Sequence, residues 1–238
     1  MNPDIFIFEN PQELAEALAW QWEKAVLSVS GKSLSIAVSG GAAPRAVFDR
    51  LAKPPFQNKV PWESVHLFWA DERCVAPNHE DSNFGTARQI LIDHISIPGN
   101  HVHRICGEEA PDLEVKRYEG EIKGYFAENG AAGFDWVQLG VGVDGHTASL
   151  FPGFHFNDSD ICSIATHPQS GQKRITLTLK TINRSARISF IATGKEKAPV
   201  ISAILNKKPE SKLYPATHVK PENGKIQWFL DKQAAALL

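Results

Sequence analysis

The sequence predicts an α/β protein, with a mostly parallel sheet that helices cover on both faces. Short apolar runs that are typical of strands alternate along the chain with longer segments of helical periodicity. Polar or glycine-rich loops follow several of these apolar runs directly, so that strand, loop and helix repeat as a unit. Parallel strands need such crossover connections, and strands covered on both faces are apolar throughout.

The first helix is expected after a short apolar start at residues 5–8. Asn10 can cap this helix, with Pro11 in its first turn and Glu13 three residues on. Gly31 ends the segment, whose apolar residues recur at helical spacing: Leu14, Leu18, Trp22, Ala25 and Val29. The run LSIAV at residues 34–38 then predicts a strand, and SGGAAP leads from it into a helix that reaches about Leu51.

The same unit recurs along the rest of the chain. VHLFW at 65–69 predicts a strand that enters the loop ADER, and Ser82 can cap the helix that carries Phe84, Ala87, Ile90 and Leu91. A short strand is expected at 102–105, a helix at 112–129 and a buried strand at 136–142. RITLTL, RISFIATG and IQWFL are typical of further strands, with a helix over about 195–205 after the second of them. The irregular segment 151–174 is either a cover over the site or an ordinary surface connection.

Composition excludes several classes of protein. The 238 residues carry 25 basic and 27 acidic side chains, a net charge of −2, which argues against a nucleic-acid binder with a broad basic field. With 42% hydrophobic and 22% charged residues the chain can bury a core, and we expect one domain over residues 1–238. No apolar run is long enough for a membrane span, and the N-terminus does not resemble a secretory signal. Three cysteines without CxxC spacing, Cys74, Cys106 and Cys162, indicate reduced thiols in a cytoplasmic protein.

Four loops hold the unusual residues: SGGAAP, DER, GVDGH and TGKEK. Each of them follows an apolar strand-like run. Loops after the carboxyl ends of parallel strands collect along one edge of the sheet, where ligands normally bind. Segments far apart in the sequence are therefore expected to share one site.

The first and last of these loops are candidates for binding a phosphate. Ser39, Gly40 and Gly41 precede a helix, so their backbone N–H groups can approach an anion at its N-terminus. The alternative is a tight turn that binds nothing. Lys197 and Arg174 can add positive charge to the same anion, although a basic residue taken alone is more often a solvated surface residue.

The other two loops are candidates for proton transfer. His146 lies between glycines with Asp144 two residues before it, and a carboxylate can orient a histidine ring that moves protons near neutral pH. Asp71, Glu72 and Arg73 can supply a second acid–base group and a cation for a developing oxyanion, or else form a local salt-bridge network.

Neither a metal site nor a covalent nucleophile is expected. The pair His101 and His103 has no evident carboxylate or cysteine companion in the sequence. The chain has no GxSxG motif, and Ser39 lacks the local signature of an activated serine.

Taken together, the motifs resemble those of 6-phosphogluconolactonases in the glucosamine-6-phosphate isomerase/deaminase-like superfamily. The resemblance runs in order from SGGAAP through FWADERCVAPNHEDSN, LGVGVDGHTASLFPG, RITLTLKTIN and IATGKEKA to GKIQWFLD. It implies a Rossmann-like three-layer α/β sandwich and a metal-independent hydrolase without a cofactor. The implied reaction opens 6-phospho-D-glucono-1,5-lactone to 6-phosphogluconate, the second step of the oxidative pentose phosphate pathway.

The resemblance also implies roles for individual residues. His146 matches the general base that activates water, with Asp144 as its partner, and Arg73 matches a substrate-contacting arginine. The phosphate site would use residues 39–41, Arg174 and Lys197, while Asp71 matches the catalytic aspartate of the related deaminases. The expected partner is a phosphosugar lactone, with no nucleic acid or membrane, and the expected assembly is a monomer or weak homodimer.

Two alternatives are an enzyme of the same superfamily and a regulator with a related fold. In amino-sugar phosphate deaminases a glutamate lies five positions after the histidine, whereas this chain has Phe151 there. A sugar-phosphate-binding transcriptional regulator would carry an additional DNA-binding helical module, for which the sequence has no spare segment.

Overall fold

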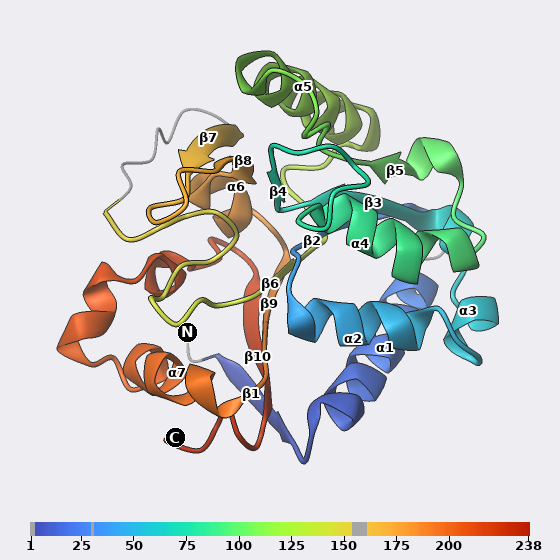
Figure 1. Ribbon diagram of the computed structural model, residues 1–238. Coiled ribbons are helices and arrows are strands. Elements are labelled where there is room, and N and C mark those ends of the chain that lie inside the picture. Colours follow the sequence, from blue (N-terminus) through green and yellow to red (C-terminus); the bar gives the residue numbers. More distant parts are fainter. Residues whose placement is uncertain (1–2, 30, 154–160) are drawn as a thin grey trace.

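The computed structural model describes residues 3–29, 31–153 and 161–238. Its central sheet has seven strands, all parallel to their neighbours, in the order β1-β10-β9-β6-β2-β3-β5 (Figure 1). The strands are β1 (Asp4–Phe8), β2 (Leu34–Val38), β3 (Val65–Trp69), β5 (Val102–His103), β6 (Trp136–Leu139), β9 (Arg187–Ala192) and β10 (Lys225–Asp231). The predicted parallel α/β architecture is therefore confirmed.

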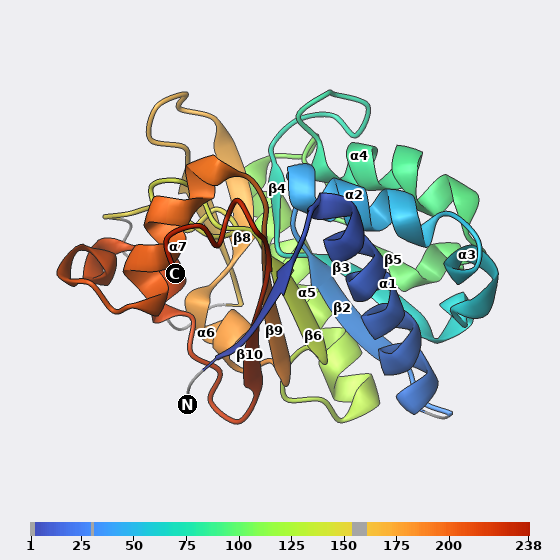
Figure 2. The same cartoon turned by 90° about the horizontal axis from the view of Figure 1, so that it is seen from below.

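Helices cover both faces of this sheet, which gives the three layers of a Rossmann-like fold (Figure 2). One face carries α1 (Pro11–Ser28), α2 (Ala42–Leu51), α3 (Phe56–Lys59) and α4 (Asn83–Ile90), and the other carries α5 (Pro111–Asn129), α6 (Leu179–Asn183) and α7 (Ala198–Leu205). Short 3₁₀ turns complete the connections: η1 (Trp62–Ser64), η2 (Ile92–His94), η3 (Gly99–His101), η4 (Lys195–Lys197), η5 (Pro209–Leu213) and η6 (Pro215–His218). None of the helices in the described residues is long and apolar enough to cross a membrane.

Two helix starts that the sequence predicts are confirmed by their caps. The Asn10 side chain accepts a hydrogen bond of 2.9 Å from the backbone N–H of Glu13, and α1 begins at Pro11. The Ser82 hydroxyl accepts one of 2.9 Å from the N–H of Gly85, and α4 follows it. Each cap satisfies a backbone donor that the first helical turn would otherwise leave unpaired.

The central strands are buried along their whole length. Every residue of β2, β6 and β9 is buried, which explains why these runs show no alternation of apolar and polar residues. The apolar face of α1 packs onto this layer through Trp22, whose ring lies 5.9 Å from the ring of Trp136. The core therefore lies on both sides of one parallel sheet.

A second, smaller sheet corrects one prediction. It has the order β4-β8-β7 and is antiparallel, with β4 (Asp71–Arg73), β7 (Cys162–Thr166) and β8 (Lys173–Leu177). The segment DER was expected to be a loop and forms β4, whereas the run RITLTL was expected to be a strand and forms β8. A sequence run shows that a segment is extended, but its pairing partner depends on segments about 100 residues away.

Several predicted boundaries are also wrong by a few residues. The strands expected at 102–105 and 136–142 end at His103 and Leu139, where their pairing with the neighbouring strands stops. The helix expected from about 195 begins as η4 and becomes α-helical at Ala198. Part of the irregular segment 151–174 forms β7, and its residues 154–160 lie outside the described part of the chain.

The strand order creates a crevice between β2 and β6. From β2 the chain continues to β3 and β5 on one side, whereas from β6 it continues to β9 and β10 on the other. The loops after β2 and β6 therefore diverge in opposite directions, and ligands of parallel α/β proteins bind at such a point.

Candidate active site

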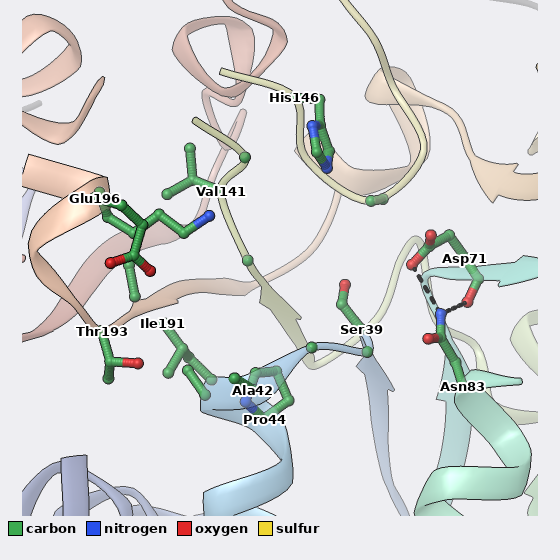
Figure 3. Close-up of a pocket in the computed structure, with 18 of the residues that line it drawn as sticks. Ser39, Ala42, Pro44, Asp71, Asn83, Val141, His146, Ile191, Thr193 and Glu196 are labelled. Atoms are coloured by element: carbon green, nitrogen blue, oxygen red, sulfur yellow. Dashed lines mark hydrogen bonds between the residues drawn. The ribbon is translucent and has the colours of Figure 1, made fainter. Parts of the chain in front are cut away.

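A pocket of about 320 Å³ opens where the loops after β2, β6 and β9 meet the small sheet (Figure 3). The predicted residues that line it are Ser39, Gly40, Gly41, Asp71, Arg73, His146, Arg174 and Lys197. They come from five separate parts of the sequence. The structure thus places them together at the edge of the sheet that the loop positions indicate.

His146 and Asp144 form a hydrogen-bonded pair beside this pocket. Nδ1 of His146 lies 2.5 Å from Oδ1 of Asp144, and the same oxygen accepts the backbone N–H of His146 at 3.2 Å. A Cβ on Gly142 would lie 2.1 Å from Nδ1, so only glycine leaves room for the pair. Burial raises the pKa of Asp144, but the charge of His146 and its hydrogen bonds outweigh this effect and hold that pKa below its usual value.

Phe151 packs between His146 and a cation. Its ring centroid lies 5.1 Å from that of His146 and 5.5 Å from the guanidinium carbon of Arg174. The Phe151 side chain is buried, and the ring of His167 meets it edge-on. An apolar wall therefore stands where a carboxylate would lie in the deaminase alternative.

Two arginines lie opposite each other on neighbouring strands of the small sheet. Arg73 of β4 and Arg174 of β8 are directly opposed in the antiparallel register, and the Nε atoms of both are buried without a hydrogen-bond partner among the described residues. Burial lowers the pKa of Arg174, and the like charge of Arg73 lowers it further. Neither guanidinium forms an ion pair with another described residue, and two neighbouring positive groups favour an anion between or beside them.

The glycine loop forms another wall of the pocket. Gly41 has a φ of 114°, which glycine adopts without steric cost, and it leads directly into the N-terminus of α2. The Ser39 hydroxyl points toward the open centre of the pocket below His146 (Figure 3). Its oxygen is buried and has no partner within the described part of the chain. Backbone and hydroxyl donors are thus available here for an anionic group.

Asp71 and Glu72 have different environments although they are neighbours. Glu72 is 1% exposed and points away from the pocket, where it accepts hydrogen bonds from the Ser82 hydroxyl and from the N–H groups of Asn83 and Phe84 at the start of α4. Burial raises its pKa despite these bonds. Asp71 lines the pocket, and its Oδ2 accepts a hydrogen bond of 2.7 Å from the Ser149 hydroxyl. Glu72 therefore holds α4, whereas Asp71 faces the pocket.

Other lining residues were not predicted from the sequence. Asn83, Thr193 and Glu196 all contribute to the pocket, and Ser149 supports it from behind Asp71. Asn83 lies in the motif FWADERCVAPNHEDSN, directly after the predicted cap Ser82. This position is the feature of the sequence that could have indicated Asn83 as a site residue. Thr193 and Glu196 lie in the same loop as Lys197.

The histidines at 101 and 103 belong to a separate cluster on the sheet edge. Nε2 of His103 lies 2.9 Å from Nδ1 of His66, and Nδ1 of His103 lies 2.7 Å from Oε1 of Glu121. Burial lowers the pKa of His66 to about 4, with smaller contributions from the charges of His101 and His103. Across residues 3–29, 31–153 and 161–238 no group of His, Cys, Asp or Glu side chains is arranged to hold a metal ion.

The fold and the pocket define a Rossmann-like α/β protein with a histidine–carboxylate pair beside a pocket that Arg73, Arg174 and Lys197 line. Within this class the chain belongs to the family described as glucosamine-6-phosphate isomerases/6-phosphogluconolactonase, whose model matches residues 9–228.

The comparisons with individual proteins cover nearly the whole chain. A 6-phosphogluconolactonase of Haemophilus influenzae is 40% identical over 232 residues, covering 97% of this chain and 98% of that protein. The 6-phosphogluconolactonase structure from Trypanosoma brucei is 28% identical with a TM-score of 0.83, covering 100% of this chain and 99% of the other. A crystal structure described as devB protein is 38% identical with a TM-score of 0.92, and 98% of each chain is covered.

Proposed function

We propose that this protein hydrolyses 6-phospho-D-glucono-1,5-lactone to 6-phosphogluconate, the second step of the oxidative pentose phosphate pathway. The observation that carries the proposal is the His146–Asp144 pair beside a pocket whose other walls carry Arg73, Arg174 and Lys197. The full-length likeness to 6-phosphogluconolactonases supports the same reaction.

His146 is the proposed general base. Its Nδ1 donates a hydrogen bond to the Asp144 carboxylate, so Nε2 carries the free lone pair and accepts a proton from water. The water oxygen then bonds to C1 of the lactone, and the carbonyl oxygen takes the negative charge. When the C1–ring oxygen bond breaks, the proton held by His146 passes to the departing ring oxygen. Asp144 stabilises the imidazolium in between.

The cations and the glycine loop have a separate proposed role. The phosphate at C6 would be bound by the N–H groups at residues 39–41 together with Arg174 and Lys197, while Arg73 would contact the lactone end and its oxyanion. Binding the distant phosphate fixes C1 relative to His146, so that binding energy is used for orientation.

Phe151 favours a lactonase over an amino-sugar phosphate deaminase. A deaminase of this superfamily would need a carboxylate beside the histidine, and here a buried aromatic ring contacts the His146 ring instead. Ring opening of the lactone requires only one base and an oxyanion contact, both of which the pocket offers.

The test is hydrolysis of lactone generated in place by glucose-6-phosphate dehydrogenase. We expect the native protein to accelerate the disappearance of the lactone well beyond its spontaneous rate, and His146→Ala to lower kcat by about a hundredfold or more. Binding of 6-phosphogluconate, measured by calorimetry, should remain in His146→Ala, because the phosphate contacts lie elsewhere in the pocket.

The matched control is His94→Ala, which removes an exposed histidine that does not line the pocket. No acceleration by the native protein would contradict the lactonase proposal. Normal turnover by a folded His146→Ala protein would contradict the general-base role alone.

A further inference from the structure

Asn83 is a buried polar residue whose amide connects two side chains of the pocket. It is the first residue of α4, it is 4% exposed, and it lies beside Asp71 in the pocket wall (Figure 3). We propose that Asn83 is a positioning residue that fixes the guanidinium of Arg73 for the lactonase reaction without neutralising its charge. This inference rests on the proposed function.

The hydrogen bonds of the amide allow only one orientation. Its Nδ2 donates to the backbone carbonyl of Asp71 at 2.9 Å, and its Oδ1 accepts from Nη1 of Arg73 at 2.9 Å. A guanidinium has donors only and a carbonyl is an acceptor only, so a reversed amide would lose both bonds. The site thus needs one donor and one acceptor on the same side chain, which asparagine supplies.

Asn83 is itself held from several sides. Its backbone N–H donates to Oε1 of the buried Glu72 at 2.8 Å, and its α4 start is capped by Ser82. A Cβ on Gly40 would lie only 1.8 Å from Oδ1, so the glycine loop packs directly against the amide. The amide therefore links the loop after β2 to the strand that carries Arg73.

The charge of Arg73 makes a neutral partner important. An arginine has several rotatable bonds, and Arg73 lies opposite the like charge of Arg174, so contacts are needed to hold its guanidinium in one place. The contacts that fix Nη1 are neutral oxygens, those of Asn83 and of the Asp81 backbone at 2.5 Å. Nη1 is thereby held while Arg73 keeps its full positive charge for the substrate.

A double-mutant cycle tests the positioning role. Asn83→Ala should lower kcat/KM by about tenfold in the native background, the size expected for losing a charge-assisted hydrogen bond. In an Arg73→Ala background the same change should lower kcat/KM by less than about twofold, because the side chain that it positions is gone. Thermal unfolding of each variant reports whether the fold is kept. If Arg73→Ala leaves no measurable turnover, the same cycle is measured on the affinity for 6-phosphogluconate.

Asn83→Asp separates positioning from simple hydrogen bonding. Its carboxylate keeps the shape and an acceptor for Arg73, but it loses the donor to Asp71 and adds a negative charge beside the substrate. We expect it to be no more active than Asn83→Ala. Asn129→Ala, a matched change at the end of α5 where the amide donates to the Tyr125 carbonyl, should leave kcat/KM unchanged.

Equal losses from Asn83→Ala in both backgrounds would overturn the inference, since Asn83 would then act independently of Arg73. Native activity in Asn83→Asp would overturn it as well. A native protein that does not accelerate lactone hydrolysis would instead contradict the proposed function, so the two failures are distinguishable.

Discussion

Asp144 shows how a single contact couples the proposed chemistry to stability. Asp144→Asn keeps the shape of the side chain but removes the carboxylate that orients His146, so we expect kcat to fall by about a hundredfold. The lactone assay measures this loss. The binding of 6-phosphogluconate should change little, and a turnover within twofold of native would contradict a role for the carboxylate.

The lowered pKa of Asp144 also predicts the pH dependence of stability. Because the folded-state pKa lies below the unfolded value of about 3.9, the contribution of the carboxylate is complete above that value and is lost as the pH falls through the folded-state pKa. The difference in free energy of unfolding between native and Asp144→Asn, measured in urea, should therefore shrink as the pH falls below about 4. A difference that grows on acidification would contradict this sign.

At the scale of elements, the start of α4 connects the stability of the fold to the pocket. Ser82→Ala removes a hydroxyl that caps Gly85 and donates to Glu72 at 3.0 Å, so we expect the free energy of unfolding to fall by about 1 kcal/mol. Urea unfolding measures the change. The control Ser28→Ala removes an exposed hydroxyl at the end of α1 and should cost less. Equal losses in the free energy of unfolding for the two variants would contradict a stabilising role of the Ser82 cap.

At the scale of the whole molecule, folding brings cations of separate elements to one pocket, where we propose that they bind an anion. An anion bound there stabilises the folded protein, so we expect 6-phosphogluconate to raise Tm in a concentration-dependent way.

Arg174→Ala and Lys197→Ala should weaken this increase in Tm and raise KM for the lactone, because both side chains line the pocket. The exposed Arg88 and Lys32 provide control substitutions to alanine. An unchanged KM in both pocket variants would contradict the proposed phosphate site.

The sequence predicted those parts of the site that follow directly from local chain order. Gly40, His146 and Lys197 each come directly after a strand-like run, and the carboxyl ends of parallel strands share one edge. It did not predict that Arg73 and Arg174 are cross-strand neighbours, because that pairing belongs to a small antiparallel sheet whose segments are far apart in the chain. Nor could the sequence predict which of Asp71 and Glu72 faces the pocket. Adjacent residues of a strand point to opposite sides, and only the position of α4 decides which of the two carboxylates is used as a cap.

By itself, the sequence determined the parallel α/β class, the helix caps at Asn10 and Ser82, and the loops that follow β2, β6 and β9 at the sheet edge, because each depends on residues near one another in the chain. The tertiary structure alone decided which side chains meet. The Asn83 amide between Asp71 and Arg73 is an example. Hydrogen bonds of this kind depend on distances set by the packing of α4 against the strands, and no local sequence pattern encodes those distances.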